Sequence, residues 1–501
     1  MSNLSELLPA GSGGKSVDFV ASGTLPNGKP VILNSDGTVS VVAVSSTTLP
    51  TSIPAGSEAV FNAAYFYSIS ASLDPNTAGK FVVAYQDGGN SYYGTAIVGT
   101  VSGTSISFGS EYVFNSAQSD YTSVSFDPNT AGKFVVAYRD VGNSSYGTAI
   151  VGTVSGTSIS YGSEYVFNST LSYDISMSFD PNTAGKFVVA YRSVSGPTGT
   201  CKAIVGTVSG TSLSYGSATT FNSDHAYYIS ASFDPNTAGK FVVAYRDAGN
   251  SQYGTAIVGT VSGTSVSFGS EYVFNASQSD YISAAFDPNN ANKFVVAYRD
   301  LGNSNYGTSI VGTVSGTSIS YGSEAVFNSG SSYYTSISFD PNTTGKFVVA
   351  YDDDANSDYG TAIVGTVSGT SISFGSEYVF NSGSTDYTSV SFDPNAAGKF
   401  VVAYRDVGNS GYGTAIVGQI AATVSATNLT STNFIGISDA AIADTASGSV
   451  TVKGGVSANL TSLTIGTDYY VQPAGTLATS AGTPSVLAGK AISATSLILK
   501  G

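Results

Sequence analysis

The sequence predicts an all-β protein built around a seven-bladed β-propeller with four-stranded antiparallel blades. The phrase "FVVAY" or a near-copy recurs with a regular spacing of 53 or 54 residues, with its phenylalanine at Phe81, Phe134, Phe187, Phe241, Phe294, Phe347 and Phe400. A fixed period identifies a repeat architecture, and roughly 40–50 residues is the size of one propeller blade. Only 10% of the 501 residues are charged, and the many Gly, Ser, Thr, Val and Tyr residues favour short strands and tight turns. We number the copies one to seven in chain order.

Copy two illustrates the four strands expected in each period. The first is 121–127, "YTSVSFD", which alternates polar and apolar residues. The second, 133–140, and the third, 147–155, are the most continuously apolar, which places them in the middle of the sheet. The fourth is 158–168, after the short Gly-containing link "VSGT".

The two ends of the array predict how it closes. A fourth-strand phrase, "GSEAVFN" at 56–62, precedes every first, second and third strand, whereas copy seven stops after its third strand at 412–418. Pairing of the N-terminal strand with the last blade would close the ring and leave no open edge. An open β-solenoid is the alternative, but it gives no reason for this offset.

The links between strands differ in character on the two expected faces of the ring. The links after the first and third strands, "DPNTAGK" and "VSGT", are nearly identical in most copies. The links after the second and fourth strands diverge, as "NSTLSYD" at 168–174 and "NSDHAYY" at 222–228 show. The flanking segments are expected to leave the ring on the uniform face, and recognition is expected on the divergent face.

Three parts of the chain follow from this organisation. We predict residues 51–419 as the propeller, with 1–50 and 420–501 as the N-terminal and C-terminal parts of one composite β platform. Residues 21–42 have a hairpin-like pattern with turns at Asn27-Gly28 and Asp36-Gly37.

The divergent face holds the candidate ligand-binding residues. Tyrosine rings stack on the C–H faces of sugars, and Asn and Asp bond to hydroxyls, so a repeated Arg, Asp, Asn and Tyr set suits carbohydrate. Weak sites repeated around a ring would gain strength by avidity. The alternative is that Arg and Asp pair between neighbouring blades while Tyr packs the blade rim. The predicted residues are Arg139, Asp140, Asn143, Tyr146, Arg246, Asp247, Asn250, Tyr253, Arg299, Asp300, Asn303 and Tyr306.

Copy six departs from the pattern with "DDDANSDYG", in which Asp352, Asp354, Asn356 and Asp358 alternate as in a calcium loop. The segment lacks the Gly and the distal Glu of such a loop, so a solvated acidic loop is the favoured interpretation. No other cofactor is expected.

Catalysis is not expected. The one histidine, His225, and the one cysteine, Cys201, are predicted in different loops, which leaves no nucleophilic pair. The aspartates of the seven "DPN" turns occupy equivalent places, which favours Asx-turn capping over glycoside hydrolysis.

Composition excludes several partners. The net charge is −15, and no stretch clusters Lys and Arg, which argues against nucleic acid and anionic membranes. The start lacks the pattern of a signal peptide, and no run approaches the roughly 20 apolar residues of a membrane span. We expect synthesis in a cytoplasm without export.

The flanking segments carry a resemblance to a known class. "SGTLPNGKPVILNSDGTVSVV" at 22–42 and "NFIGISDAAIADTASGSVTVKGG" at 433–455 resemble small β domains of tailed-phage head-decoration and virion structural proteins. "YYVQPAGTLATS" at 469–480 and "VLAGKAISATSLILKG" at 486–501 resemble C-terminal segments of marine phage structural and tail-fibre proteins.

This resemblance implies a virion surface protein that is assembled in the host cytoplasm and is often trimeric. Its partners would be other virion proteins, bound through the platform, and a host-surface glycan. The leading expectation is therefore a non-enzymatic tail-fibre or head-fibre adhesin. The alternatives are a capsid decoration protein without a ligand and a surface adhesin of a cell.

Overall fold

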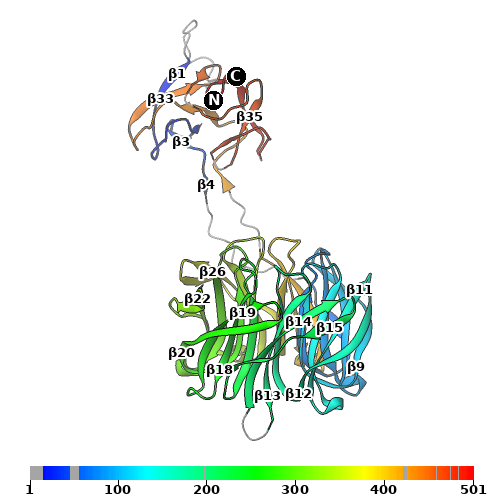
Figure 1. The fold of residues 1–501 in the computed structure, drawn as a ribbon. Helices are drawn as coiled ribbons and strands as arrows, with labels where there is room; N and C mark the ends of the chain where they lie inside the picture. Colours follow the sequence, from blue (N-terminus) through cyan, green and yellow to red (C-terminus); the bar gives the residue numbers. More distant parts are fainter. Residues whose placement is uncertain are drawn as a thin grey trace. The chain divides into compact units, whose positions relative to one another are not determined.

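The computed structural model describes residues 15–45, 56–195, 199–420, 426–458, 460–473, 475–482 and 484–500. The chain divides into two compact units: residues 51–422, here called the repeat region, and residues 1–50 with 423–501, here called the flanking unit (Figure 1). The described residues form strands and short 3-10 turns with no α-helix, so the predicted all-β class is confirmed. Nothing in these described ranges is a helix long and apolar enough to cross a membrane.

The flanking unit combines strands from both ends of the chain. One five-stranded sheet has the order β1-β33-β32-β2-β3, formed by Ser16–Val20, Ser447–Val452, Phe434–Ser438, Pro30–Leu33 and Val39–Val41. Strands β2 and β3 form a hairpin, as the sequence predicts, with Gly37 in the left-handed region at φ 85°. A short pair joins β31 (Ala426–Thr427) to β4 (Val44–Ser45).

A second sheet of the flanking unit comes from the C-terminal segment alone. Its order is β34-β38-β37-β35-β36, formed by Val456–Ser457, Leu497–Leu499, Val486–Ala491, Asp468–Val471 and Leu477–Ala478. One apolar cluster joins Ile32 and Val42 from the N-terminal part to Phe434, Val471 and Leu497 from the C-terminal part. The two sequence segments therefore share a core.

The repeat region follows the predicted strands closely. In copy two, β10 (Lys133–Asp140) and β11 (Tyr146–Ser155) form the middle of the sheet and lie between β9 (Ser105–Phe126) and β12 (Ser158–Phe179).

Equivalent elements recur along the chain. The strands of the other copies are β5 (Ala59–Asn62), β6 (Phe66–Leu73), β7 (Lys80–Asp87), β8 (Tyr93–Ser102), β13 (Lys186–Val194), β14 (Gly199–Ser209), β15 (Ser212–Tyr215), β16 (Thr219–Asn222), β17 (Ala226–Phe233), β18 (Lys240–Asp247), β19 (Tyr253–Ser262), β20 (Ser265–Phe286), β21 (Lys293–Asp300), β22 (Tyr306–Ser315), β23 (Ser318–Tyr321), β24 (Ala325–Phe339), β25 (Lys346–Asp353), β26 (Tyr359–Ser368), β27 (Ser371–Phe374), β28 (Tyr378–Phe392), β29 (Lys399–Asp406) and β30 (Tyr412–Gln419). The 3-10 turns are η2 (Gly88–Asn90), η3 (Val141–Asn143), η4 (Leu301–Asn303), η5 (Asp354–Asn356) and η6 (Val407–Asn409).

The link predicted between the fourth strand of one copy and the first strand of the next is itself strand in several copies. In β12, Leu171 is in register with Tyr146 of the preceding sheet and with Val194 of the following one. One continuous strand therefore serves two successive sheets. Its backbone is hydrogen-bonded on both sides, which explains why polar residues such as Ser172 are fully buried there.

The apolar clusters of the repeat region lie between neighbouring copies, as where Val82 and Val98 of copy one pack with Phe134 and Tyr138 of copy two. The phenylalanine that opens the second strand, such as Phe134, is completely buried. Its ring occupies the space above Gly152 on the paired strand, and a Cβ added to that glycine would overlap the ring. The glycine of "AIVG" is therefore required by packing rather than by backbone conformation.

The "DPN" turns join consecutive copies. Asp180 is buried, and its Oδ1 accepts from the backbone N–H of Asn182 at 2.9 Å, which makes the predicted Asx turn. Its Oδ2 accepts from the N–H of Gly239 in the next copy at 3.2 Å. The Asn182 side chain also reaches the next copy, where it donates to the carbonyl oxygen of Pro235 at 3.2 Å.

The first and last copies are joined by the same bonds. Strand β5 pairs antiparallel with β30, in the place of a fourth strand. Tyr404 donates to Glu58 at 2.8 Å, as Tyr138 does to Glu164 within the array. The Asn395 side chain donates to the carbonyl oxygen of Pro75 at 3.2 Å. The two ends of the repeat array are therefore hydrogen-bonded to each other.

Candidate functional site

One position near the start of each first strand has a backbone conformation that side chains rarely adopt. Its φ lies between 48° and 52° in every copy, at Ser68, Tyr121, Asp174, Tyr228, Tyr281, Tyr334 and Tyr387. We call these seven residues the inner ring. The strand register shifts at this position, as between Ser123 and Asp120 opposite β10, so each inner-ring residue sits in a β-bulge. A bulge redirects a side chain, and positive φ at a bulky residue marks a site where strain is maintained.

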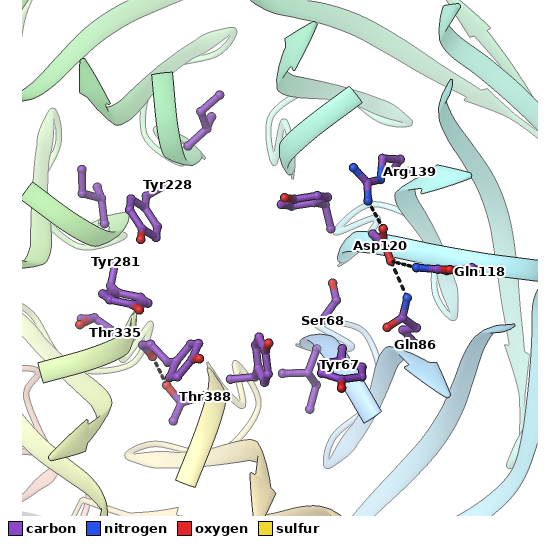
Figure 2. A pocket seen from close by; sticks show the side chains of 16 residues that line it. Tyr67, Ser68, Gln86, Gln118, Asp120, Arg139, Tyr228, Tyr281, Thr335 and Thr388 are labelled. Atoms are coloured by element: carbon purple, nitrogen blue, oxygen red, sulfur yellow. Dashed lines mark hydrogen bonds and ion pairs between the residues drawn. The ribbon is translucent and has the colours of Figure 1, made fainter. Parts of the chain in front are cut away.

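Six of the seven inner-ring residues, all except Asp174, line a cavity of about 620 Å³. Its lining comes from the first strands of several copies and from the ends of two second strands, and includes Tyr67, Ser68, Gln86, Gln118, Asp120, Tyr121, Arg139, Tyr228, Tyr281, Tyr334 and Tyr387. Figure 2 shows Tyr228 and Tyr281 on one side of this cavity and the Arg139–Asp120 group on the other. The cavity therefore has an aromatic wall and a polar wall.

The aromatic wall is a chain of rings from consecutive copies. The ring centroids of Tyr228 and Tyr281 lie 5.0 Å apart, those of Tyr281 and Tyr334 lie 5.2 Å apart, and those of Tyr334 and Tyr387 lie 4.7 Å apart. All three pairs are tilted or edge-to-face, the arrangements that aromatic quadrupoles favour. These mutual contacts hold each ring in place at the cavity.

The polar wall is centred on Asp120. Its Oδ2 pairs with the Arg139 guanidinium, and its Oδ1 accepts from Gln86 and, at 3.2 Å, from Gln118. Asp120 is the one carboxylate among the residues that line the cavity. Its lone pairs are engaged by three donors, so this wall offers the amide and guanidinium groups of its neighbours to a ligand.

A belt of alternating Arg and Tyr lies beside the cavity. The guanidinium carbon of Arg192 lies 4.5 Å from the ring centroid of Tyr173 and 4.8 Å from that of Tyr227. Arg192 also pairs with Asp174 at 2.9 Å. The same arrangement of a guanidinium on tyrosine faces, neutralised by a carboxylate, recurs at Arg139, Arg246, Arg299 and Arg405.

Burial keeps the cavity hydroxyls neutral. Desolvation raises the pKa of Tyr121, Tyr228, Tyr281, Tyr334 and Tyr387 above its ordinary value, and the nearby arginines oppose this shift in each case. A neutral phenol both donates and accepts a hydrogen bond. These hydroxyls are therefore donors to a ligand at neutral pH.

The structure divides the predicted Arg, Asp, Asn and Tyr set. Arg139 lines the cavity, whereas Arg246 and Arg299 belong to the belt and pair with Asp280. The alternative of Arg–Asp pairing was therefore partly right. Arg246 pairs with Asp280 on the first strand of the next copy, Arg299 pairs with Asp280 on the first strand of its own copy, and neither pairs with the adjacent Asp247 or Asp300 of the set. Asp280 directly precedes the bulge at Tyr281.

The remaining members of the set lie outside the cavity. Asp140, Asp247 and Asp300 are buried caps, and Asp300 Oδ1 accepts from Asn275 at 2.9 Å and from the N–H of Gly302 at 3.0 Å. Asn143, Asn250 and Asn303 are exposed on the turns, and Tyr146, Tyr253 and Tyr306 are half-buried at the start of a strand. A second cavity, of about 740 Å³, includes Asp247 and Asn250 in its lining.

The acidic segment of copy six does not form a metal cluster. Asp352 is buried in β25, whereas Asp354 and Asn356 form the exposed turn η5 and Asp358 follows it. No group of three or more His, Cys, Asp or Glu side chains in the described ranges is arranged to hold a metal ion. Asp354 and Asp358 lie close to each other, and burial first and then these two carboxylates raise the pKa of Asp352, but the group is not arranged to hold a metal ion.

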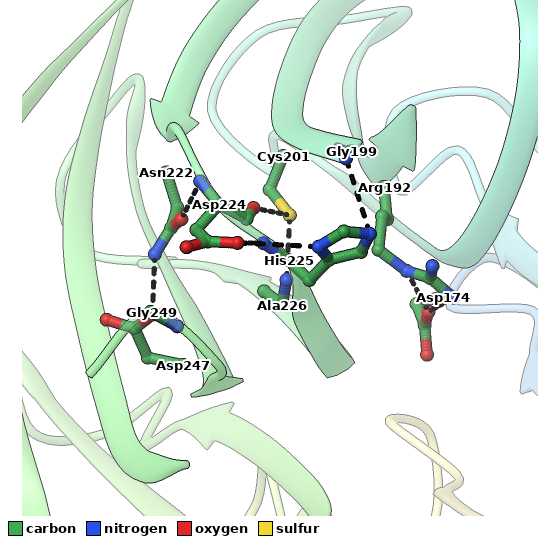
Figure 3. A network of polar contacts seen from close by, with 10 residues as sticks. All are labelled: Asp174, Arg192, Gly199, Cys201, Asn222, Asp224, His225, Ala226, Asp247 and Gly249. Atoms are coloured by element: carbon green, nitrogen blue, oxygen red, sulfur yellow. Dashed lines mark hydrogen bonds and ion pairs between the residues drawn. The ribbon is translucent and has the colours of Figure 1, made fainter. Parts of the chain in front are cut away.

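His225 and Cys201 lie closer together than the sequence predicted. Cys201 is in strand β14, where its Sγ accepts from the N–H of Ala226 at 3.1 Å and faces the carbonyl oxygen of Asp224 at 3.4 Å (Figure 3). His225 Nε2 accepts from the N–H of Gly199 at 3.3 Å. Burial raises the pKa of the Cys201 thiol to about 12, so the thiol stays protonated and is a poor nucleophile.

Sequence reasoning missed the inner ring because it assigned these residues to the start of a regular strand. The available signal was a tyrosine that recurs at one place in copies two and four to seven, just before the alternating polar and apolar residues of the first strand. At the bulge, neighbouring first strands are hydrogen-bonded through side chains, as where the N–H of Thr122 donates to Ser68 Oγ at 2.7 Å. No local residue pattern encodes this contact.

No family model matches the chain, and no curated protein matches it. Solved structures that are similar in fold include Sqt1 of Chaetomium thermophilum bound to the N-terminus of the ribosomal protein L10, at 11% identity and a TM-score of 0.46, covering 71% of this chain and 88% of that one.

Two other structures show a comparable likeness. AofleA from Arthrobotrys oligospora is 10% identical with a TM-score of 0.44, covering 65% of this chain and 90% of that one. The NanB sialidase of Streptococcus pneumoniae is 11% identical with a TM-score of 0.42, covering 74% of this chain and 71% of that one. At these identities and scores, the likenesses say nothing of what this chain binds.

Proposed function

We propose that this chain is a non-enzymatic attachment protein whose repeat region binds carbohydrate in the inner-ring cavity. The observation that carries the proposal is the pair of facing walls, one of stacked tyrosines and one of amide and guanidinium groups. Sugars have apolar C–H faces, which stack on tyrosine rings, and hydroxyl edges, which bond to amide and guanidinium groups.

The proposed architecture is a closed seven-bladed β-propeller. Its support is the pairing of β5 with β30 and the hydrogen bond from Tyr404 to Glu58. In copy two, for example, the fourth strand and the equivalent Glu164 come from the chain that follows the third strand. In copy seven, the N-terminal strand β5 and Glu58, which directly precedes it, take these places. In a closed ring the first strands surround the axis. The six inner-ring side chains that line the cavity then converge on one central site.

A binding role is favoured over hydrolysis. Glycosidases of the common types place two carboxyl groups on opposite sides of the bond they cleave. The cavity lining contributes Asp120 alone, and Arg139 and two glutamines hold that carboxylate. The strained backbone of the inner ring fits preorganised recognition, because fixed rings lose little entropy when a ligand stacks on them.

The attachment role rests on the flanking unit. Its sequence resemblance to small β domains of tailed-phage virion proteins implies a surface position on a particle, with the flanking unit as the docking part and a homo-oligomer such as a trimer as the assembled form. Host-surface glycan would then be the target of the repeat region. A capsid decoration protein without a ligand is the competing role.

A glycan array tests the proposal. We expect the wild-type protein to bind one class of saccharide, and Tyr281→Ala and Tyr334→Ala to weaken that binding at least tenfold. Tyr306→Ala is the matched control, because Tyr306 is a half-buried tyrosine of the divergent turns outside the cavity. Loss of binding in the control alone, or no binding of any saccharide by the wild type, would reject the cavity as a carbohydrate site.

A further inference from the structure

The Arg–Tyr belt is interrupted at one copy. The belt position directly follows the "FVVAY" phrase of the second strand, and it is occupied in chain order by Gln86, Arg139, Arg192, Arg246, Arg299, Asp352 and Arg405. Six of these seven side chains carry N–H donors. Asp352 alone is an acceptor, so copy six lacks the group that its neighbours use at this place.

The surroundings of Asp352 remain those of a cation site. Gln86 and Arg246 each donate to the carboxylate of the following first strand, Asp120 and Asp280 respectively. The residue equivalent to these two carboxylates for copy six is Asp386. Asp352 and Asp386 are therefore two carboxylates in a place where other copies pair a carboxylate with a donor.

The carboxylate of Asp352 is buried without a partner. The residue is 5% exposed, and its Oδ1 has no hydrogen-bond partner among the described residues. A buried carboxylate oxygen without a donor has lost its hydration without a compensating hydrogen bond, which is unfavourable. Arg405 pairs with Asp386 and leaves Asp352 without a cation of its own.

The tyrosine ring of this site in copy six has fewer cation contacts than the equivalent rings of copies three and four. Tyr173 and Tyr227 each lie between two guanidinium groups, from Arg139 and Arg192 and from Arg192 and Arg246. Tyr333, the equivalent ring of copy six, has the Arg299 guanidinium 4.6 Å from its centroid and no second cation over it in the described part of the chain. Copy six therefore supplies no cation of its own to this ring.

We propose that copy six binds an organic cation, specifically a guanidinium group, between the ring of Tyr333 and the carboxylates of Asp352 and Asp386. The belt itself is the template, because five other copies hold an arginine guanidinium by two or three tyrosine faces and a carboxylate. Planar guanidinium suits both contacts: it stacks on aromatic rings and pairs with carboxylates in a fixed geometry. This site is independent of carbohydrate binding in the cavity.

Calorimetric titration of the full-length protein with methylguanidinium tests this site. Wild type should bind, and Asp352→Asn should weaken binding at least tenfold. Asp352→Arg should abolish binding, because its own side chain would fill the place as in the other copies. Its melting temperature should equal or exceed that of wild type, which shows that loss of binding is not loss of fold.

Asp354→Asn is the matched control, since Asp354 is an exposed carboxylate of the same acidic segment. We expect it to change the affinity less than threefold. Equal weakening by Asp354→Asn and Asp352→Asn would overturn the proposal in favour of general attraction to the acidic loop. Undiminished binding by Asp352→Arg would overturn it as well, as would displacement of methylguanidinium by calcium at equimolar concentration.

Discussion

The two ends of each first strand use repetition in opposite ways. At one end, the "DPN" turn has the same three residues in all seven copies, and its bonds join each copy to the next. At the other end, the inner-ring position keeps one backbone conformation while its residue changes among Ser, Tyr and Asp. The turn residues that bond one copy to the next are therefore the same in every copy. At the inner-ring position, the backbone conformation is the same in every copy but the side chain varies.

The largest effect that separates the two ends should come from the turn. Asp180→Ala removes the acceptor of two backbone N–H groups, those of Asn182 and Gly239. Each buried donor left unsatisfied costs about 1–3 kcal/mol, so we expect a loss of about 2–5 kcal/mol in the free energy of unfolding, measured by urea denaturation. Asp180→Asn keeps one acceptor oxygen and should lose less. Equal stability of Asp180→Ala and wild type would contradict a bonding role for this turn.

The inner ring should show the reverse behaviour. Tyr281→Gly removes three ring contacts worth about 0.5–1.5 kcal/mol each and relieves a positive φ that costs about 1–3 kcal/mol. Because these two effects oppose each other, the free energy of unfolding should fall by less than about 4 kcal/mol, while saccharide binding is lost. A large loss of stability would show that the ring is structural.

Alkaline pH should act on the buried tyrosines as a group. Burial raises the pKa of Tyr281, Tyr334 and other tyrosines in the folded state, so they stay protonated while unfolded tyrosines ionise near pH 10. The stability they contribute is fully present below about pH 10 and falls as the pH rises above it. Urea midpoints measured from pH 8 to 11.5 should be flat at first and then decline. A decline that starts near pH 8 would contradict this assignment.

The smallest effect expected is in the pH dependence of binding. Because the cavity hydroxyls remain protonated in the folded state, saccharide affinity should vary by less than about twofold between pH 7 and 9. Fluorescence or calorimetric titration at these two values checks it. A steep change in this range would indicate that another titrating group contacts the ligand.

Much of the repeat could be predicted from the sequence, because its patterns are local. The strand 133–140 was predicted with the bounds that β10 has, and the "DPN" aspartates were correctly interpreted as Asx-turn caps. The apolar run and the Pro-containing turn determine these features within a few residues of chain.

The site could not be predicted in the same way. Arg139 and Asp140 are adjacent in sequence, yet one faces the cavity and the other caps the turn at η3, because successive residues of a strand point to opposite sides. The partner of Arg246 is Asp280, which lies in the following copy. Such contacts depend on how neighbouring copies pack against each other. The residue pattern within one copy does not specify that packing.

The central claim is that the walls of the inner-ring cavity bind saccharide, and a structure of the complex tests it most directly. Crystals or frozen particles prepared with the saccharide selected on the array should show it stacked on Tyr281 or Tyr334, with hydroxyls bonded to Gln86, Gln118 or Arg139. A saccharide bound instead at the outer turns, such as beside Asn250, or an empty cavity under saturating ligand, would contradict the account.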